Sequence, residues 1–366
     1  MERGRRNLAS IPSLQTPRAA AVVVEVMDIE LEHVPCPLCR DDNPVPVITG
    51  RDVLCGVPGS FHIVRCSSCH HFYLNPRPNE ATIGACYPSD YGPYKTPEVT
   101  DVGGTESGHA DQSPEPIEPS PAPWYLSKWF RMIPGPRWLY YWLTDFKTDY
   151  IPSGTPGRAL DVGCAGGNFL TKLRENGWRA EGVELMSEPA NVARSRGFEV
   201  SEGTLEEAAF PEETFDAVFA SMVFEHLHEP RTTMQEVDRV LKPGGWFVLT
   251  VPNFACWERY VFGGYWRGLE LPRHLQHYTP RLLRGLLGEH GFDRIRVVHQ
   301  RNLNNIIATI GLWLRERSWG AKLGQRMIDF TDEPGMWWQL VLAIPAKVLA
   351  FFRQGGRLTV IARKVG

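Results

Sequence analysis

The sequence predicts an α/β fold in which a mostly parallel sheet is covered by helices on both faces. From residue 158 onward, short apolar runs alternate with segments whose apolar residues recur at helical spacing. The first of these runs ends in a cluster of small residues, Gly163 to Gly167, and a helical pattern follows it. Strands that alternate with helices are typical of parallel sheets, because each crossover places a helix on a face of the sheet.

The elements are predicted from apolar composition, spacing and terminating residues. The predicted strands are 158–162, 180–185, 215–220, 246–251, 292–298 and 358–363. The first predicted helix follows the glycine cluster and ends at Gly177, and the second ends at Arg196. A third helix carries Met234 and Val237, and a fourth begins at Thr279 and Pro280, which suit an N-cap and a first helical position.

Length and composition indicate a core domain with accessory segments. The chain has 366 residues, of which 43% are hydrophobic and 22% are charged, so it can bury a large core. Its formal net charge is -3. That balance argues against a protein built to neutralise nucleic-acid phosphates, and a nucleic-acid partner is not expected.

Five units are expected along the chain. Residues 1–33 are a tail that contains a candidate strand at Val22–Leu31, and residues 34–97 form a compact unit. Residues 98–123 are read as a flexible linker, because the stretch 99–123 holds five acids, many prolines and no Lys or Arg. Residues 124–154 are rich in aromatic side chains and predict a helical cap that packs on the next domain, or alternatively one that covers a ligand pocket. The main domain is 155–366.

An insertion at 301–356 separates the last two predicted strands. It contains the apolar run 336–352, which is interrupted by Gln339, Pro345 and Lys347 and is too short to span a bilayer comfortably. We expect a helical lid on the edge of the sheet. The alternative is an apolar surface for a lipid-linked acceptor or for peripheral contact with a membrane.

No targeting segment is expected. The apolar run Ala19–Val24 is too short for a signal-peptide core, and no stretch reaches the roughly 20 apolar residues of a spanning helix. These features favour a reducing cytoplasm.

Four of the eight cysteines form two tight pairs in the 34–97 unit, Cys36 with Cys39 and Cys66 with Cys69. Two Cys-x-x-Cys knuckles can complete a tetrahedral zinc site, and the gap between them predicts an intervening hairpin. Redox-active pairs or unconnected thiols are the alternatives. His70 and His71 adjoin the last cysteine as alternative ligands, but four cysteines suffice.

The glycine cluster carries the first functional signal, because ligands bind at the carboxyl ends of parallel strands. Asp161 precedes the first glycine, where it would repel a pyrophosphate and favour a cationic or amine-bearing ligand. Glu184 ends the next strand, and a carboxylate there can accept both hydroxyls of a ribose.

These residues resemble the first motif and the ribose acid of class I S-adenosylmethionine-dependent methyltransferases, over residues 155 to 300. The resemblance implies a Rossmann-like, seven-stranded, mostly parallel sheet. It implies cofactor contacts by the following residues: Asp161, Gly163, Ala165, Gly167, Glu184, Thr204, Leu205 and Glu225. Ala165 stands where glycine is usual, and its methyl group is tolerable there if its φ is negative. The turn Leu241–Gly245 resembles the one before the family's fifth strand.

The zinc unit, with the segment 71–78 after it, resembles a bacterial subfamily that includes sugar C-methyltransferases and enzymes of glycan or natural-product clusters. The resemblance implies a small-molecule acceptor, such as a sugar or a glycan precursor. A ubiquinone-type O-methyltransferase with a lipophilic acceptor, a zinc-ribbon enzyme that modifies nucleic acid and a non-catalytic binding module are the alternatives. The acceptor atom stays open.

Three histidines are candidates for the group that removes the acceptor's proton. His226 follows the predicted fourth strand, where the methyl group is expected, and His274 and His277 lie just before a predicted helix. A structural histidine bonded to backbone is the alternative for each.

Overall fold

The computed structural model describes residues 29–87, 150–152, 156–301, 303–332 and 336–366. The expected linker at 98–123, the tail up to residue 28 and all but three residues of the expected cap at 124–154 lie outside the described residues. Of the candidate strand Val22–Leu31, only its end is described, and β1 covers Leu31–Glu32.

A seven-stranded sheet in the order β12-β13-β10-β9-β6-β7-β8 forms the centre of the molecule. Its strands are β6 Arg158–Val162, β7 Arg179–Glu184, β8 Glu199–Glu202, β9 Phe215–Ser221, β10 Leu241–Pro252, β12 Phe292–His299 and β13 Arg357–Lys364. The pairs from β10 to β8 are parallel, while β13 runs antiparallel to β10 and to β12. The predicted mostly parallel, Rossmann-like sheet is therefore confirmed.

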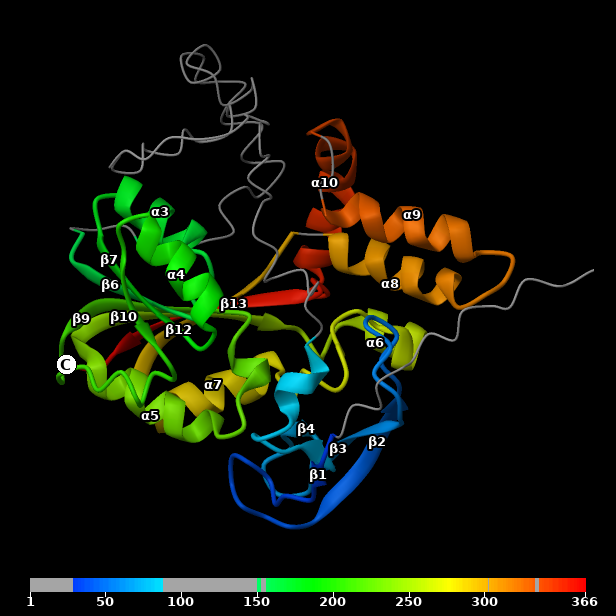
Figure 1. The fold of residues 1–366 in the computed structure, drawn as a ribbon, viewed down its shortest axis with the longest axis horizontal. Helices are drawn as coiled ribbons and strands as arrows, with labels where there is room; N and C mark the ends of the chain where they lie inside the picture. Colours follow the sequence, from blue (N-terminus) through cyan, green and yellow to red (C-terminus); the bar gives the residue numbers. More distant parts are fainter. Residues whose placement is uncertain (1–28, 88–149, 153–155, 302, 333–335) are drawn as a thin grey trace, which may run out of the picture.

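Helices cover both faces of this sheet (Figure 1). On one side lie α3 (Asn168–Glu175) and α4 (Ser187–Ser195), and on the other lie α5 (Pro230–Val240) and α7 (Pro280–Glu289). The start of α7 is as predicted, because the Thr279 side chain accepts a hydrogen bond from the Leu282 N–H at 3.3 Å.

A small second sheet has the order β11-β4-β3-β2 and joins two distant parts of the chain. Its strands are β2 Pro44–Gly50, β3 Phe61–Cys66, β4 Phe72–Leu74 and β11 Gln276–His277. The hairpin of β2 and β3 separates the two cysteine pairs, as predicted. Since β11 belongs to the segment just before α7, the N-terminal unit shares its sheet with the main domain.

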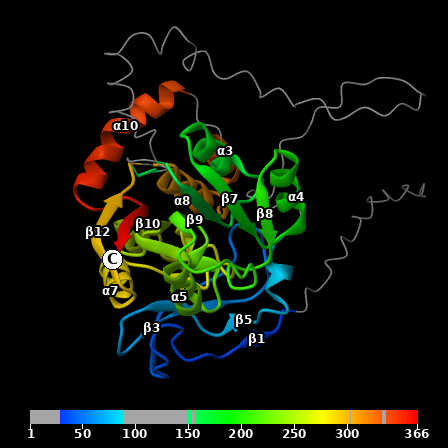
Figure 2. The same ribbon diagram turned by 90° about the vertical axis from the view of Figure 1, so that its left-hand side faces the viewer.

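Two further pieces complete this side of the molecule. β1 pairs with β5 (Arg77–Pro78), and the short helix η1 spans Ile83–Cys86. Between β10 and β11 lie α6 (Trp257–Phe262) and η5 (Gly263–Tyr265). Figure 2 shows the β1, β3 and β5 strands on the side of the main sheet where α5 lies.

The insertion between β12 and β13 consists of α8 (Asn304–Arg315), α9 (Ala321–Asp332) and α10 (Met336–Phe351). α8 and α9 pack closely at Gly311 and Gly324. A Cβ on Gly311 would lie only 2.8 Å from the carbonyl oxygen of Gly324, so this contact requires glycine. Among the described residues, no helix is long and apolar enough to cross a membrane.

Candidate functional site

The site lies where the chain changes direction across the sheet. From β6 the chain moves outward to β7 and β8, and then returns to β9 on the other side of β6. Ligands of open α/β sheets bind at such a switch point, outside the carboxyl ends of the strands. The glycine cluster after β6 and the short helix η4 (Phe224–His226) after β9 both lie at this edge.

Two glycines of the cluster have conformations that require glycine. Gly163 has a φ of 73°, and a Cβ there would lie 2.5 Å from the Val223 side chain. Gly167 has a φ of 80° and precedes α3, and its Cβ would lie 3.1 Å from the Cβ of Ala193. Both glycines are thus required by their positive φ and by the close packing of the turn on Val223 and Ala193.

The negative φ under which alanine is readily tolerated at position 165 is not adopted. The φ of Ala165 is 45°, in the left-handed region that residues with a Cβ rarely adopt. The conformation aims the Ala165 N–H at the carboxylate of Glu184, with a distance of 2.8 Å to Oε2. A charge-assisted hydrogen bond of this kind offsets a backbone cost of about 1–3 kcal/mol.

Glu184 ends β7 as a buried carboxylate that is already oriented by backbone. Its Oε2 accepts from Ala165, and its Oε1 accepts from the Met186 N–H at 3.0 Å. A carboxylate has about four lone-pair positions, so capacity for two hydroxyl donors remains. This arrangement fits the ribose of S-adenosylmethionine, and the buried Asp161 on β6 adds negative charge suited to a cationic cofactor.

The two residues expected at the adenine lie in different surroundings. Thr204 is exposed, and its hydroxyl accepts the Glu207 N–H at 3.2 Å. Leu205 is buried among the residues of the main hydrophobic core. Both follow β8, at the same edge of the sheet as Glu184.

Glu225 is fully buried in η4, and among the described residues neither of its carboxylate oxygens has a hydrogen-bond partner. Burial, together with the charge of Glu270, raises the pKa of Glu225 to about 8. An unpaired buried carboxyl is costly, and it is found mostly where function requires it.

His226 is held by two neighbours. Its Nδ1 lies 3.1 Å from the carbonyl oxygen of Arg273 and 3.0 Å from the hydroxyl of Tyr87. A carbonyl oxygen can only accept, so Nδ1 carries the hydrogen and Nε2 keeps its lone pair. Burial lowers the pKa of His226, which favours the neutral ring.

His274 is oriented in the same way. Its Nδ1 lies 3.0 Å from the carbonyl oxygen of Gly268, and its ring lies edge-on to that of His226 with 4.7 Å between centroids. Burial lowers the pKa of His274 to about 3. The structure thus brings Glu225, His226 and His274 together, with one ligand atom of each within 4.8 Å of the others.

His277 lies outside this group. It is part of β11, and its ring packs on Phe254 with 5.0 Å between centroids. Burial lowers the pKa of His277 well below its usual value. Its surroundings are those of a core residue of the small sheet.

Sequence reasoning missed the residues that position these histidines. Arg273 directly precedes His274 and supplies the carbonyl to His226, and Glu270 lies 3.7 Å from the Nε2 of His274. Tyr87 lies some 139 positions before His226 in the chain. Nothing in the spacing of these residues signals a contact, because the contacts depend on how the N-terminal unit docks.

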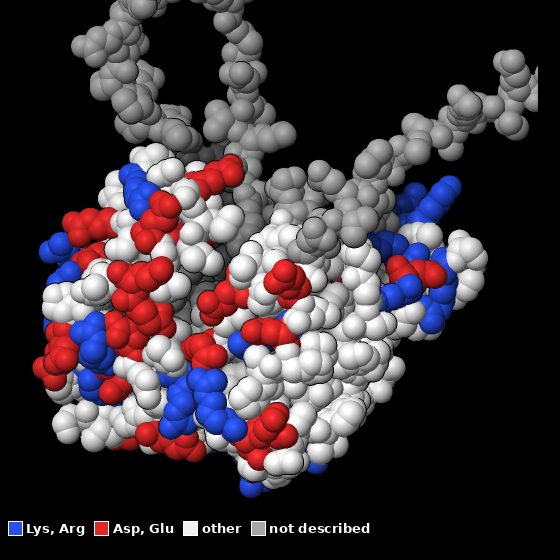
Figure 3. All heavy atoms as spheres, turned by 60° about the horizontal axis from the view of Figure 1, so that its bottom comes forward, with Lys and Arg blue, Asp and Glu red and all other residues white. Residues whose placement is uncertain are grey.

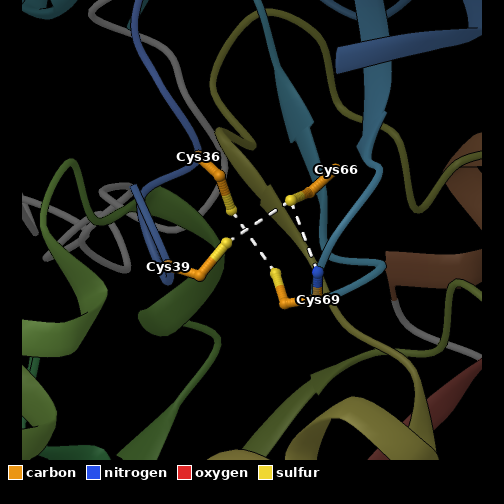
Figure 4. Close-up of side chains that lie close together, drawn as sticks. All are labelled: Cys36, Cys39, Cys66 and Cys69. Atoms are coloured by element: carbon orange, nitrogen blue, oxygen red, sulfur yellow. Dashed lines mark hydrogen bonds between the residues drawn. The ribbon is translucent and has the colours of Figure 1, made fainter. Parts of the chain in front are cut away.

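The four paired cysteines converge from two knuckles, and their sulfur atoms point toward one another (Figure 4). Sγ of Cys36 lies 3.5 Å from Sγ of Cys69, and Sγ of Cys39 lies 3.4 Å from Sγ of Cys66. In a tetrahedral zinc site with Zn–S bonds of about 2.3 Å, sulfur atoms are about 3.8 Å apart. A disulfide would need about 2.05 Å. The donor set and its spacing therefore fit zinc.

Both knuckles have the same backbone geometry. The residue after each second cysteine, Arg40 or His70, has a positive φ of 64° or 61°. The Cys36 N–H donates to the Asp41 carbonyl at 2.9 Å, and the Cys66 N–H donates to the His71 carbonyl at 2.8 Å. His71 is not turned toward the sulfur atoms, because its Nε2 lies 2.7 Å from Oε1 of Gln276.

Comparison with known proteins gives a family match and curated relatives. Residues 137–297 match the model of a family described as a methyltransferase domain. A ubiquinone biosynthesis O-methyltransferase of Xanthomonas oryzae pv. oryzae is 30% identical over 156 residues, which are 39% of this chain and 65% of that protein. One from Sodalis glossinidius is 25% identical over 196 residues, or 50% of this chain and 78% of the other. The chain thus spans just under two thirds of the Xanthomonas relative.

Solved structures of methyltransferases are also similar. One is an S-adenosylmethionine-dependent methyltransferase from Mesorhizobium loti, with a TM-score of 0.41 and 18% sequence identity. The match covers 62% of this chain and 98% of that one.

Proposed function

We propose that this chain, whose residues 137–297 match a methyltransferase family model, transfers a methyl group from S-adenosylmethionine to a small-molecule acceptor. The observation that carries the proposal is the glycine-containing turn at 163–167, whose Ala165 N–H donates to the buried, backbone-oriented carboxylate of Glu184. Asp161, Gly163, Ala165, Gly167 and Glu184 hold the cofactor in this proposal, with Thr204 and Leu205 near its base.

When bound, the cofactor supplies an electrophilic methyl group on a positively charged sulfur. The protein's part is to orient the acceptor for in-line attack and to remove its proton. His226 is the proposed proton acceptor, because its Nδ1 is held by the Arg273 carbonyl and its Nε2 keeps a lone pair. The lowered pKa of His226 keeps the ring ready to accept a proton near neutral pH.

The proposed acceptor is a sugar or a glycan precursor that carries a hydroxyl group. The support is the zinc unit, whose small sheet shares β11 with the segment that carries His274. A second candidate is a lipophilic acceptor, favoured by the curated relatives, which are named ubiquinone biosynthesis O-methyltransferases. Nucleic acid is not favoured, because the formal net charge is -3 and the face in Figure 3 mixes charges of both signs.

We also propose that Cys36, Cys39, Cys66 and Cys69 bind a structural zinc ion. The support is the fit of their sulfur spacing and the matched backbone of the two knuckles. The ion would fix the turns that lead into β2 and out of β3.

Peripheral membrane contact is proposed for α10. Large apolar side chains recur along it at intervals of three or four residues and are at least half exposed: Trp338, Val341, Ile344, Val348 and Phe351. The helix contains Lys347 and no acidic residue, as suits an anionic lipid surface. Flotation with anionic liposomes tests this proposal, and a chain that stays at the bottom of the gradient contradicts it.

Methyl transfer is tested in two steps. Calorimetry with S-adenosylmethionine should show binding at one site, and no detectable binding would contradict the function. Labelled cofactor is then incubated with nucleotide sugars, lipid-linked glycans and phenolic quinone precursors. Label in a sugar supports the first acceptor class, label in a phenol supports the second, and label in neither with bound cofactor contradicts both.

A further inference from the structure

The group of Glu225, His226 and His274 has features that proton transfer alone does not explain. One ligand atom from each residue lies within 4.8 Å of the other two. Around an ion with tetrahedral bonds of about 2.1 Å, ligand atoms are about 3.4 Å apart. The separations in this group would have to shrink by up to about 1.4 Å for the three side chains to contact a common ion.

The two imidazole rings are oriented as metal ligands usually are. Nδ1 of His226 is 3.1 Å from the Arg273 carbonyl, and Nδ1 of His274 is 3.0 Å from the Gly268 carbonyl. Metal-binding histidines almost always donate their second ring N–H to a carbonyl or carboxylate, which fixes the tautomer. In both rings the atom left with a lone pair is Nε2.

Glu225 supplies a negatively charged ligand beside the two neutral imidazoles. It is fully buried, and within the described part of the chain both of its oxygens are without hydrogen-bond partners. Buried polar groups in folded proteins are nearly always satisfied, so an exception on a carboxylate points to a partner that the polypeptide does not supply.

A second buried carboxyl lies beside the group. Glu270 Oε2 is 3.7 Å from Nε2 of His274. Its charge is offset by Arg267, and by Arg273 with 3.7 Å between Nε and Oε1. The carboxyl that a bound cation would satisfy is therefore that of Glu225.

We propose that Glu225, His226 and His274 bind a divalent first-row metal ion, separate from the four-cysteine zinc site. Two imidazoles with one carboxylate are a donor set for Zn²⁺, Mn²⁺, Fe²⁺ or Co²⁺ rather than for Ca²⁺, which takes oxygen ligands only. Three protein ligands leave at least one coordination position open.

The open position gives the ion a role in methyl transfer, and in this respect the inference rests on the proposed function. An acceptor hydroxyl that binds the ion loses its proton more readily, because the cation stabilises the oxyanion. The O–H bond breaks and the proton passes to a water molecule. The oxygen then bonds to the methyl carbon as the carbon–sulfur bond breaks and leaves its electron pair on sulfur. With the ion bound, Nε2 of His226 is a metal ligand, so the solvent takes the proton that this nitrogen accepts in the metal-free site.

The test is metal stoichiometry of the full chain, which needs no turnover. The purified protein is stripped with a chelator, dialysed against Zn²⁺ or Mn²⁺ and analysed for metal by mass spectrometry. The wild type should bind about two Zn²⁺ and about one Mn²⁺, since thiolates select Zn²⁺ while nitrogen and oxygen donors accept both. Glu225→Gln and His274→Gln should each lose one Zn²⁺ and the Mn²⁺.

Matched variants control for the effects of substitution. Glu258→Gln changes another buried glutamate, one whose Oε2 already accepts from the Trp266 Nε1 at 3.2 Å, and His290→Gln changes a half-buried histidine at the end of α7. Both should keep the wild-type metal content. Thermal melts check folding, and metal-free Glu225→Gln should melt at or above the wild-type temperature because an unpaired carboxylate is gone.

Two results would overturn the inference: a wild type that binds no Mn²⁺ and no more than one Zn²⁺, or a Glu225→Gln variant that keeps the second ion. Failure of the proposed function has a different signature. A chain that transfers methyl without a second ion contradicts only the metal site, whereas a chain that binds the second ion but methylates no acceptor contradicts only the function.

Discussion

Arg273 and Asp52 form a fully buried, two-pronged ion pair between the N-terminal unit and the main domain. Nη1 of Arg273 lies 2.9 Å from Oδ2 of Asp52, and Nη2 lies 3.0 Å from Oδ1. The same carboxylate accepts three backbone N–H groups of the loop after β2, from Leu54, Cys55 and Val57. The carbonyl of Arg273 in turn orients His226. The pair therefore links the loop of one unit to the catalytic candidates of the other.

Replacing Asp52 should damage both stability and activity. Asp52→Asn removes the two-pronged partner of the buried guanidinium and leaves only the Glu270 carboxylate, 3.7 Å from Nε; breaking a buried pair typically costs about 3–5 kcal/mol. Chemical denaturation should show a loss of that order, and methyl transfer should fall because His226 loses its orientation. Arg51→Gln is the control, since Arg51 is largely exposed in its pair with Glu316, and such pairs are worth about 0–1 kcal/mol. If Asp52→Asn and Arg51→Gln lowered stability and methyl transfer equally, the role assigned to the Asp52–Arg273 pair would be contradicted.

Glu184→Gln should weaken cofactor binding while leaving the fold intact. The change removes charge from an acceptor proposed to hold two ribose hydroxyls, a loss of about 1.5–3 kcal/mol or roughly 10–100-fold in Kd. Calorimetry with S-adenosylmethionine measures it. Glu202→Gln, at the end of the neighbouring strand β8, is the matched control and should bind normally. An unchanged Kd for Glu184→Gln would remove the ribose assignment.

His226→Ala should retain cofactor binding and lose turnover. A group that removes a proton from a bound acceptor contributes roughly 10²–10⁴-fold, and the cofactor contacts proposed here lie on other residues. Initial rates with labelled cofactor and calorimetry on the same preparation separate the two effects. His290→Ala, on the far end of α7, should behave like the wild type. Near-normal kcat/KM in His226→Ala would contradict the assignment.

Zinc binding at the cysteine cluster should release protons. In the absence of a cation, burial raises the pKa of Cys66 to about 11, and the Cys36 sulfur holds the pKa of Cys69 well above its usual range. These thiols are therefore protonated at neutral pH and must lose their protons to bind the ion. A weakly buffered titration with Zn²⁺ should show acidification that Cys69→Ser reduces and that Cys55→Ser, outside the cluster, leaves unchanged.

Glu225 should lower the stability of the metal-free protein as pH rises through its titration range. Its pKa is raised from 4.5 to about 8, so the folded state binds the proton more tightly than the unfolded state between those values. The contribution of Glu225 to the free energy of unfolding therefore decreases from about pH 4.5 to pH 8. Relative to the wild type, Glu225→Gln should gain a few degrees in melting temperature at pH 8. The buried Glu258, with a pKa raised to about 7, contributes in the same direction, whereas buried histidines with lowered pKa values contribute in the opposite direction below about pH 6.5.

An exposed carboxyl provides the comparison. Glu207→Gln should leave the slope between pH 5 and 8 unchanged, since this side chain lies at the surface. If Glu225→Gln has the same slope as the wild type, the carboxyl is ionised in the folded protein through a partner, and the assignment of an unpaired group is wrong.

The strands of the main domain were predictable because their signal is local. Apolar β-branched runs ended at glycines or polar residues, and the run at 158–162 became β6 with the same bounds. β10 is longer than its predicted 246–251, because it begins at Leu241 and passes through an irregular register around the Leu241–Gly245 turn. The knuckles were predictable for a similar reason, since the turn that brings two cysteines three residues apart to the same side is local.

The sequence by itself determined the order of the elements, the turn at 163–167, the position of Glu184 and the two cysteine pairs. Each of these features depends on contacts between residues that are close in the sequence, where the chain has few conformations to choose from. Only the tertiary structure decided that β11 completes the small sheet, that Asp52 pairs with Arg273 and that Glu225, His226 and His274 share one buried space. These contacts cross large sequence separations, where the energy comes from burial and charge pairing between units. The tertiary structure also decided the positive φ of Ala165, because the hydrogen bond to Glu184 outweighs the local conformational preference of alanine.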